Sequence, residues 1–111
     1  MAKKFARIIM MKAKPGKGGE FLKRFRDDVA ATAVEIEGMR RLYLFRPAGK
    51  KDEFVAVSLW DDREAAEQYA RSGKNKEYGR RLAAVQEGEE RVKKYEVEVH
   101  VLGKRSATSE D

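Results

Sequence analysis

Residues 53–60 constrain the fold of this chain more than any other segment, because a strand pattern changes directly into a helical one at their end. Their side chains alternate as in a β-strand and stop at Trp60, the single tryptophan. Asp61 and Asp62 follow, and either can cap the next helix; Asp61 with Glu64 resembles a capping box. The junction predicts a large indole at the end of a sheet, beside a helix N-terminus, where a small pocket can form.

The other segments complete an alternation of strands and helices. The remaining elements are expected at residues 5–13 (strand), 20–37 (helix, ended by Gly38), 39–46 (strand), 65–85 (helical region, broken near Ser72 and Gly73) and 92–102 (strand). The order β-α-β-β-α-β predicts an α+β, ferredoxin-like fold, with a four-stranded antiparallel sheet and both helices on one face. We expect one domain over residues 1–102 and a polar, disordered tail at residues 103–111.

Apolar side chains occupy both faces of the first three predicted strands, although the helices can cover only one face. A monomer would therefore expose a large apolar patch. A symmetric homodimer with two sheets packed face to face covers this patch most simply, and a different partner protein is the alternative.

The charge of the chain does not indicate nucleic-acid binding. Its 25 lysines and arginines exceed its 19 acidic residues, but the acidic residues interrupt the basic ones along most of the sequence. RNA-recognition domains share the same order of elements and stack bases on aromatic residues of the first and third strands. When Phe54 is aligned with that motif, the required aromatic falls on Asp52 and the glycine on Lys51, so we expect no nucleic-acid partner.

Missing residue types exclude several other classes of site. The chain has no cysteine, which excludes disulfides and thiolate chemistry, and its one histidine, His100, excludes a multi-histidine metal site. We therefore expect no metal. No apolar run is long enough to cross a membrane, and the N-terminus lacks a signal-peptide h-region, so we expect a cytoplasmic protein.

Three short motifs give the chain a family resemblance. They are Ser58-Leu-Trp60-Asp-Asp-Arg-Glu-Ala at the junction, Pro15-Gly16 before the first helix, and Ile36-Glu37-Gly38 before the second strand. Together with the order of elements, they make residues 5–102 resemble the antibiotic biosynthesis monooxygenase (ABM) domain family. The resemblance implies a dimeric α/β barrel, a homodimer formed through the helix-free face of the sheet.

The resemblance also implies a function. One branch of the family consists of cofactor-independent monooxygenases, which oxidise phenols or quinols in an apolar cleft between sheet and helices; the substrate supplies the reducing power. For a member of this branch no cofactor is expected, Trp60 and Tyr69 would pack against a flat aromatic, and Tyr43 or Ser58 would hydrogen-bond to its oxygens. The alternative is a non-enzymatic dimer that binds a small ligand or has a structural role.

Haem binding or haem degradation is a second alternative, but the residues used by that branch of the family are missing. The branch uses an asparagine on the first strand, whereas the only asparagine here is Asn75. Its tryptophan and histidine in the second helical region fall on Tyr69 and Gly79. In addition, Ser58 replaces an acidic residue that the family often carries two positions before the tryptophan, which removes a potential base.

Two of the candidate residues also have a structural interpretation. His100 is a candidate base or haem ligand because histidine titrates near neutrality. Its predicted strand face also carries Glu96 and Glu98, which favours a solvated, ion-paired histidine. For Trp60, packing against a helix is the commoner role of an aromatic at the end of a sheet.

Overall fold

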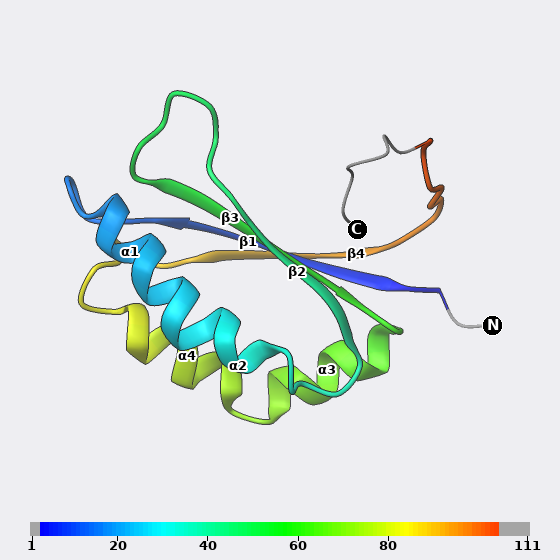
Figure 1. The fold of residues 1–111 in the computed structure, drawn as a ribbon. Helices are drawn as coiled ribbons and strands as arrows, with labels where there is room; N and C mark the ends of the chain where they lie inside the picture. Colours follow the sequence, from blue (N-terminus) through cyan, green and yellow to red (C-terminus); the bar gives the residue numbers. More distant parts are fainter. Residues whose placement is uncertain (1–2, 105–111) are drawn as a thin grey trace.

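Four antiparallel strands form the sheet on which the fold is built (Figure 1). The computed structural model describes residues 3–104. β1 (Phe5–Lys12) pairs with β3 (Glu53–Trp60) on one side and with β4 (Arg91–Glu96) on the other, and β2 (Met39–Phe45) pairs with β3. The resulting order, β2-β3-β1-β4, confirms the predicted ferredoxin-like arrangement.

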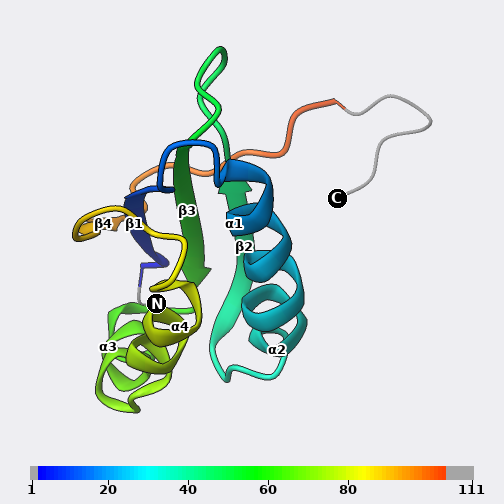
Figure 2. The same cartoon turned by 90° about the vertical axis from the view of Figure 1, so that its left-hand side faces the viewer.

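Two helical segments cover one face of this sheet (Figures 1 and 2). The first runs through α1 (Gly18–Arg24), the π-helical η1 (Phe25–Ala30) and α2 (Ala31–Ala33). The second consists of α3 (Arg63–Arg71) and α4 (Lys74–Leu82). Both segments lie on the same side of the sheet, as predicted. The tail predicted at residues 103–111 lies outside the described residues from residue 105 onward.

Glycines with positive φ occupy the ends and breaks of these segments. Gly73 (φ 85°) separates α3 from α4, which confirms the predicted break. The first segment ends at Ala33, earlier than the predicted residue 37, because the amides of Glu35 and Ile36 bond to carbonyls three residues back and tighten the chain into a turn. Gly38 (φ 84°) therefore lies in the connection to β2, and the prediction that it ends the helix is wrong.

The last strand is also shorter than predicted. It ends at Glu96 instead of residue 102, because Glu96 already pairs with Phe5, the first residue of β1. One further backbone hydrogen bond joins the amide of Val97 to the carbonyl of Lys4 (2.9 Å). Residues 98–104 then extend away from the sheet (Figure 1).

Asp62 caps α3 at the junction with β3. Its carboxylate accepts a hydrogen bond from the amide of Ala65 (2.9 Å) and satisfies one of the free donors of the first turn. Asp61 instead pairs with Arg40 of β2 at 3.0 Å. The capping box predicted for Asp61 with Glu64 is therefore wrong, although the helix begins where the sequence predicts.

The core lies between the sheet and the helices. Burial alternates along β3, and the side chains of Phe54, Ser58 and Trp60 face the helices. Phe54 stacks on Phe21 of α1, with ring centroids 4.6 Å apart. Trp60 is fully buried at the opposite end of the strand. Burying each of these large aromatic side chains stabilises the fold by about 2–3 kcal/mol.

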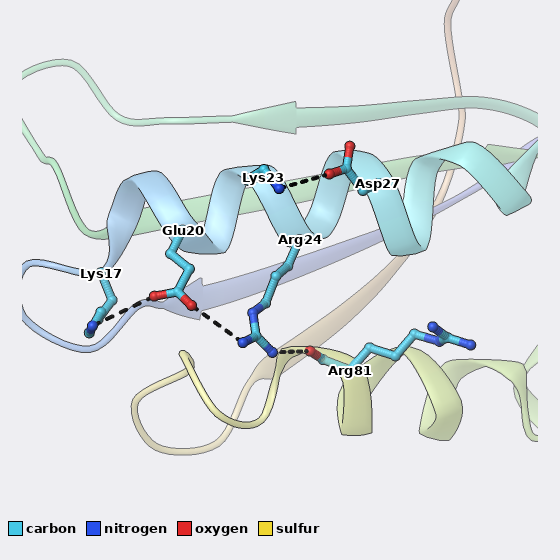
Figure 3. A network of polar contacts seen from close by, with 6 residues as sticks. All are labelled: Lys17, Glu20, Lys23, Arg24, Asp27 and Arg81. Atoms are coloured by element: carbon cyan, nitrogen blue, oxygen red, sulfur yellow. Dashed lines mark hydrogen bonds and ion pairs between the residues drawn. The ribbon is translucent and has the colours of Figure 1, made fainter.

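Polar contacts on the surface join the two helical segments (Figure 3). Arg24 of α1 donates to the carbonyl of Arg81 in α4 (3.4 Å) and to the carboxylate of Glu20 (3.3 Å). Lys17 also reaches Glu20, at 3.6 Å. Because these side chains are partly exposed, each ion pair contributes about 0.5 kcal/mol or less. These contacts mainly orient the helices, because Arg24 holds α1 beside the end of α4.

The other face of the sheet is apolar, and no helix of residues 3–104 covers it (Figure 1). At its centre lie half-buried side chains of β1 and β3, namely Ile8, Met10, Val55, Val57 and Leu59. Tyr43 and Phe45 of β2 stack on each other at 5.5 Å. They are 38% and 52% exposed, and Tyr95 of β4 is 46% exposed. This surface is the apolar patch that the strand pattern predicts.

The start of α1 offers a test of this packing. A β-carbon on Gly18 would collide with the backbone carbonyl of Lys51 and lie 2.7 Å from the carboxylate of Asp52, which accepts a hydrogen bond from the Gly18 amide (3.0 Å). Gly18→Ala should therefore lower the free energy of unfolding by about 1–3 kcal/mol in urea denaturation. The matched control is Gly19→Ala, which meets open space and should raise it by about 0.5 kcal/mol. Equal stabilities for the two variants would contradict the close approach.

Candidate functional site

A cavity of about 100 Å³ lies between the helix-covered face of the sheet and the helices. Its wall is largely apolar and includes Ile9, Met11, Phe25, Val29, Leu42, Leu82 and Val92. Polar side chains enter the lining at Arg7, Ser58, Tyr69, Asn75, Tyr78, Gln86 and Glu90. Apolar walls with a few polar groups are typical of a site for a small organic ligand.

The pairing of β1 with β3 determines which polar groups face this cavity. Arg7 lies opposite Ser58, and two residues earlier Phe5 lies opposite Trp60. Because alternate residues of a strand share a face, these four side chains all point toward the helices. A shift of the pairing by one residue would move Arg7 and Ser58 to opposite faces.

Ser58 and Trp60 form a buried hydrogen-bonded pair. The indole Nε1 of Trp60 donates to the Oγ of Ser58 at 2.9 Å. The serine therefore acts as acceptor toward the indole and keeps its own O–H to donate. Trp60 is not among the residues that line the cavity; it packs behind the wall against Phe5 and Ala66. Its contact with the cavity is thus indirect, through Ser58 and Tyr69.

Tyr69 stands between Trp60 and Arg7. Its ring centroid lies 5.0 Å from that of Trp60, and the guanidinium carbon of Arg7 lies over the tyrosine ring, 5.2 Å from its centroid, as in a cation–π contact. Burial raises the pKa of Tyr69 to about 12, and the positive charge of Arg7 opposes part of this rise. The phenol is therefore neutral at physiological pH and can donate a hydrogen bond.

Arg7 is the polar group that the sequence reasoning missed. It is only 5% exposed, and its Nε is buried without a hydrogen-bond partner in the part of the chain that the structure describes. A signal was present in the sequence: Arg7 shares the odd-numbered face of its strand with Phe5, Ile9 and Met11. A charged residue between apolar neighbours on one face of a strand is a candidate for burial, but only the packing of the helices shows that it is buried.

The cavity brings together two of the predicted site residues, Tyr69 and Ser58. Trp60 adjoins both of them from behind the wall. Tyr43 lies on the opposite face of the sheet, because it pairs with Val57 and not with Ser58. His100 is exposed in the segment after β4 and lines none of the cavities found among the described residues.

Two residues that marked departures from the haem-degrading pattern, Asn75 and Gly79, also line the cavity, from α4. Tyr78 lies between them on the chain, and its hydroxyl shares a hydrogen bond with that of Thr32 (2.7 Å).

Within residues 3–104, no group of three or more His, Cys, Asp or Glu residues is placed to hold a metal ion. No helix in the same range is long and apolar enough to span a membrane.

Several solved structures share this fold. SnoaB, a cofactor-independent oxygenase from Streptomyces nogalater, superposes in a mutant form with a TM-score of 0.75, at 19% identity over 90% of this chain and 98% of its own. A conserved protein from Methanosarcina mazei gives 0.72, at 18% identity over 84% and 91%. A protein of unknown function from Nitrosomonas europaea gives 0.74, at 16% identity over 93% and 97%. At these identities the similarity establishes the fold.

The sequence itself establishes the family. No curated protein matched it. The family model described as antibiotic biosynthesis monooxygenase matches residues 4–81, which is more than two thirds of the chain and includes β1 to β3 and the Trp60 junction. This protein therefore belongs to the antibiotic biosynthesis monooxygenase family.

Proposed function

We propose that the protein is a cofactor-independent oxygenase that acts on a small phenol or quinol bound in the cavity. The observation that carries the proposal is that two hydroxyl donors, Ser58 and Tyr69, line a largely apolar cavity. Family membership and the fold shared with SnoaB support it. Polar donors in an apolar, water-poor site stabilise charge that develops on a substrate oxygen.

The chemistry can be written without a cofactor. A phenol and dioxygen give a quinone and water: one oxygen atom forms the new C–O bond, and the other leaves as water with two hydrogens from the substrate. All four electrons that reduce dioxygen come from the ring. The residues assist the first stage, in which the phenol gives its proton to solvent water and the resulting anion reacts with dioxygen. Ser58 and Tyr69 would hold the phenolic oxygen by hydrogen bonds.

The size of the cavity limits which substrates can bind. A volume of about 100 Å³ is smaller than an engineered cavity of about 150 Å³ that binds benzene in another protein, so the cavity can take at most one aromatic ring, and only if side chains shift slightly. A porphyrin is several times larger and would require the helices to separate from the sheet. A single-ring phenol or hydroquinone is therefore the substrate class we favour over haem.

Oxygen consumption tests the proposal. With a panel of single-ring phenols and hydroquinones in an oxygen electrode, the protein should consume dioxygen faster than buffer alone, in a 1:1 ratio to quinone formed. Ser58→Ala should lower kcat by roughly 100- to 1000-fold, because it removes one donor to the developing charge. Tyr43→Phe is the matched control and should leave the rate unchanged, since Tyr43 lies on the other sheet face. No uptake above the blank with any substrate would favour the non-enzymatic alternative.

The same proposal includes a homodimer formed through the helix-free face of the sheet. Half-buried Val57 lies at the centre of that face, and the exposed apolar residues Val99, Val101 and Leu102 follow β4, at 82%, 78% and 70% exposure. Apolar surface of this extent on a monomer is usually covered by a partner. A two-fold axis would let two copies cover each other with one interface.

Sedimentation velocity tests the dimer. The protein should sediment with about twice the chain mass of 12.7 kDa. Val57→Lys, which introduces a charge at the centre of the face, should shift it toward the monomer. Val34→Lys is the matched control and should stay dimeric, because Val34 is 85% exposed at the end of the first helical segment. A stable monomer of the unmodified protein would overturn this part of the proposal.

A further inference from the structure

We propose that Arg7 makes the cavity a site for a single-ring aromatic anion, whose anionic oxygen, from a carboxylate or a phenolate, pairs with the guanidinium. The inference deepens the proposed function and rests on it for the aromatic character of the ligand. Beyond the proposed function, it states that the ligand is an anion and that Arg7 is the residue that selects for the negative charge. The burial of Arg7 is the first observation that supports it.

Arg7 is a buried charge without a counter-charge. Its side chain is 5% exposed, and an arginine keeps its proton in any protein environment. None of the ion pairs among residues 3–104 includes Arg7. Removing a guanidinium from water without an anionic partner is strongly unfavourable. A fold that retains such a group has an interaction for it that the isolated chain lacks.

The neighbours of Arg7 do not supply that interaction. Tyr69 offsets only part of the desolvation: its ring lies 5.2 Å from the guanidinium carbon and its hydroxyl has a polar interaction with Arg7, but the neutral phenol carries no negative charge. Glu90 is the one carboxylate among the cavity-lining residues of the described chain, but it is exposed and forms no ion pair with Arg7. The buried Nε therefore remains without an acceptor among residues 3–104.

The charges behind Arg7 add to its positive potential. Lys94 of β4 lies directly opposite Arg7 in the sheet and shares its face. A second hollow behind the cavity is lined by both residues together with Arg63 and Glu67. Glu67 already pairs with Arg63 at 3.3 Å. The charges left unpaired in this second hollow, those of Arg7 and Lys94, are therefore positive, which disfavours a cationic ligand beside Arg7 and favours an anionic one.

The other donors in the cavity complete a binding wall. Ser58 lies opposite Arg7 on β3 and keeps its O–H to donate, and Tyr69 is a neutral donor beside the guanidinium. Phe25, Val29 and Leu42 line the same cavity with apolar surface. An anionic oxygen at the donors and a ring against the apolar side chains would satisfy both parts of the cavity. The planar guanidinium of arginine can donate two parallel hydrogen bonds to the two oxygens of a carboxylate, or donate to the single oxygen of a phenolate.

The test compares benzoate with benzamide, which has nearly the same shape and no charge. Titration calorimetry under nitrogen, which prevents oxidation, should show benzoate binding roughly 10- to 100-fold more tightly than benzamide. Arg7→Met should abolish this preference, and Arg7→Lys should retain a weaker one. Arg91→Met is the matched control: it also removes one positive charge, but from the other face of the sheet, and the preference should persist.

A third probe identifies the source of the anionic oxygen. 4-Nitrophenol, titrated in its neutral and ionised forms, should bind more tightly when ionised. If the phenolate exceeds benzoate in affinity, the partner of Arg7 is the phenolic oxygen that reacts; if benzoate is tighter, it is a separate carboxylate on the ring. Both results support an anion site.

Other results would overturn the inference. Equal affinity for benzoate and benzamide, no binding of either anion, or an undiminished preference in Arg7→Met would each contradict it. If Arg7→Met fails to fold, the affinities of the three probes for the unmodified protein and for Arg7→Lys still test whether the cavity prefers an anion. The proposed function fails separately. If the protein binds anions but consumes no oxygen, the anion site is retained and the oxygenase function is rejected. If it consumes oxygen but prefers no anion, the oxygenase function is retained and the anion site is rejected.

Discussion

The pairing register of β1 with β3 is the constraint on which the rest of this structure depends. It places Phe5 opposite Trp60 and Arg7 opposite Ser58, so that the packing of the core and the polar groups of the cavity are set by the same hydrogen bonds. The register is strongly determined, because a slip by one residue would expose the apolar side chains that face the helices. The core therefore holds the cavity residues in place without any contact from a ligand.

Trp60 connects the fold to the site. The indole is fully buried, so its single N–H needs an acceptor, and Ser58 two residues earlier provides it. The same contact fixes the serine hydroxyl at the cavity wall. Tyr69 packs against the indole and presents a neutral phenol beside Arg7. The tryptophan at the strand–helix junction thus orients the donors without itself facing the cavity.

Much of the fold was predictable from the sequence, and less of the site. Residues 53–60 form β3 as predicted, because one face of that strand is buried and its alternation is clear. The phase of the other strands was harder to predict. Tyr43 turns away from the cavity because a register irregularity between Met39 and Arg41 shifts β2 against β3. His100 lies outside the sheet because the pairing of β4 with β1 ends at Glu96 and Phe5, with one further backbone hydrogen bond from Val97 to Lys4.

Arg7 shows why a site cannot be predicted from residue types alone. In a chain with 25 basic residues, one arginine within a strand resembles a solvated surface group. Its burial follows from strands on both sides and helices above, which are tertiary features.

Arg7 is kept for a ligand and not for stability. Urea denaturation of the ligand-free protein and of Arg7→Met tests this most directly. The account predicts that the variant is as stable or more stable, by up to about 4 kcal/mol. A loss of about 3 kcal/mol, typical of removing one member of a buried ion pair, would contradict it.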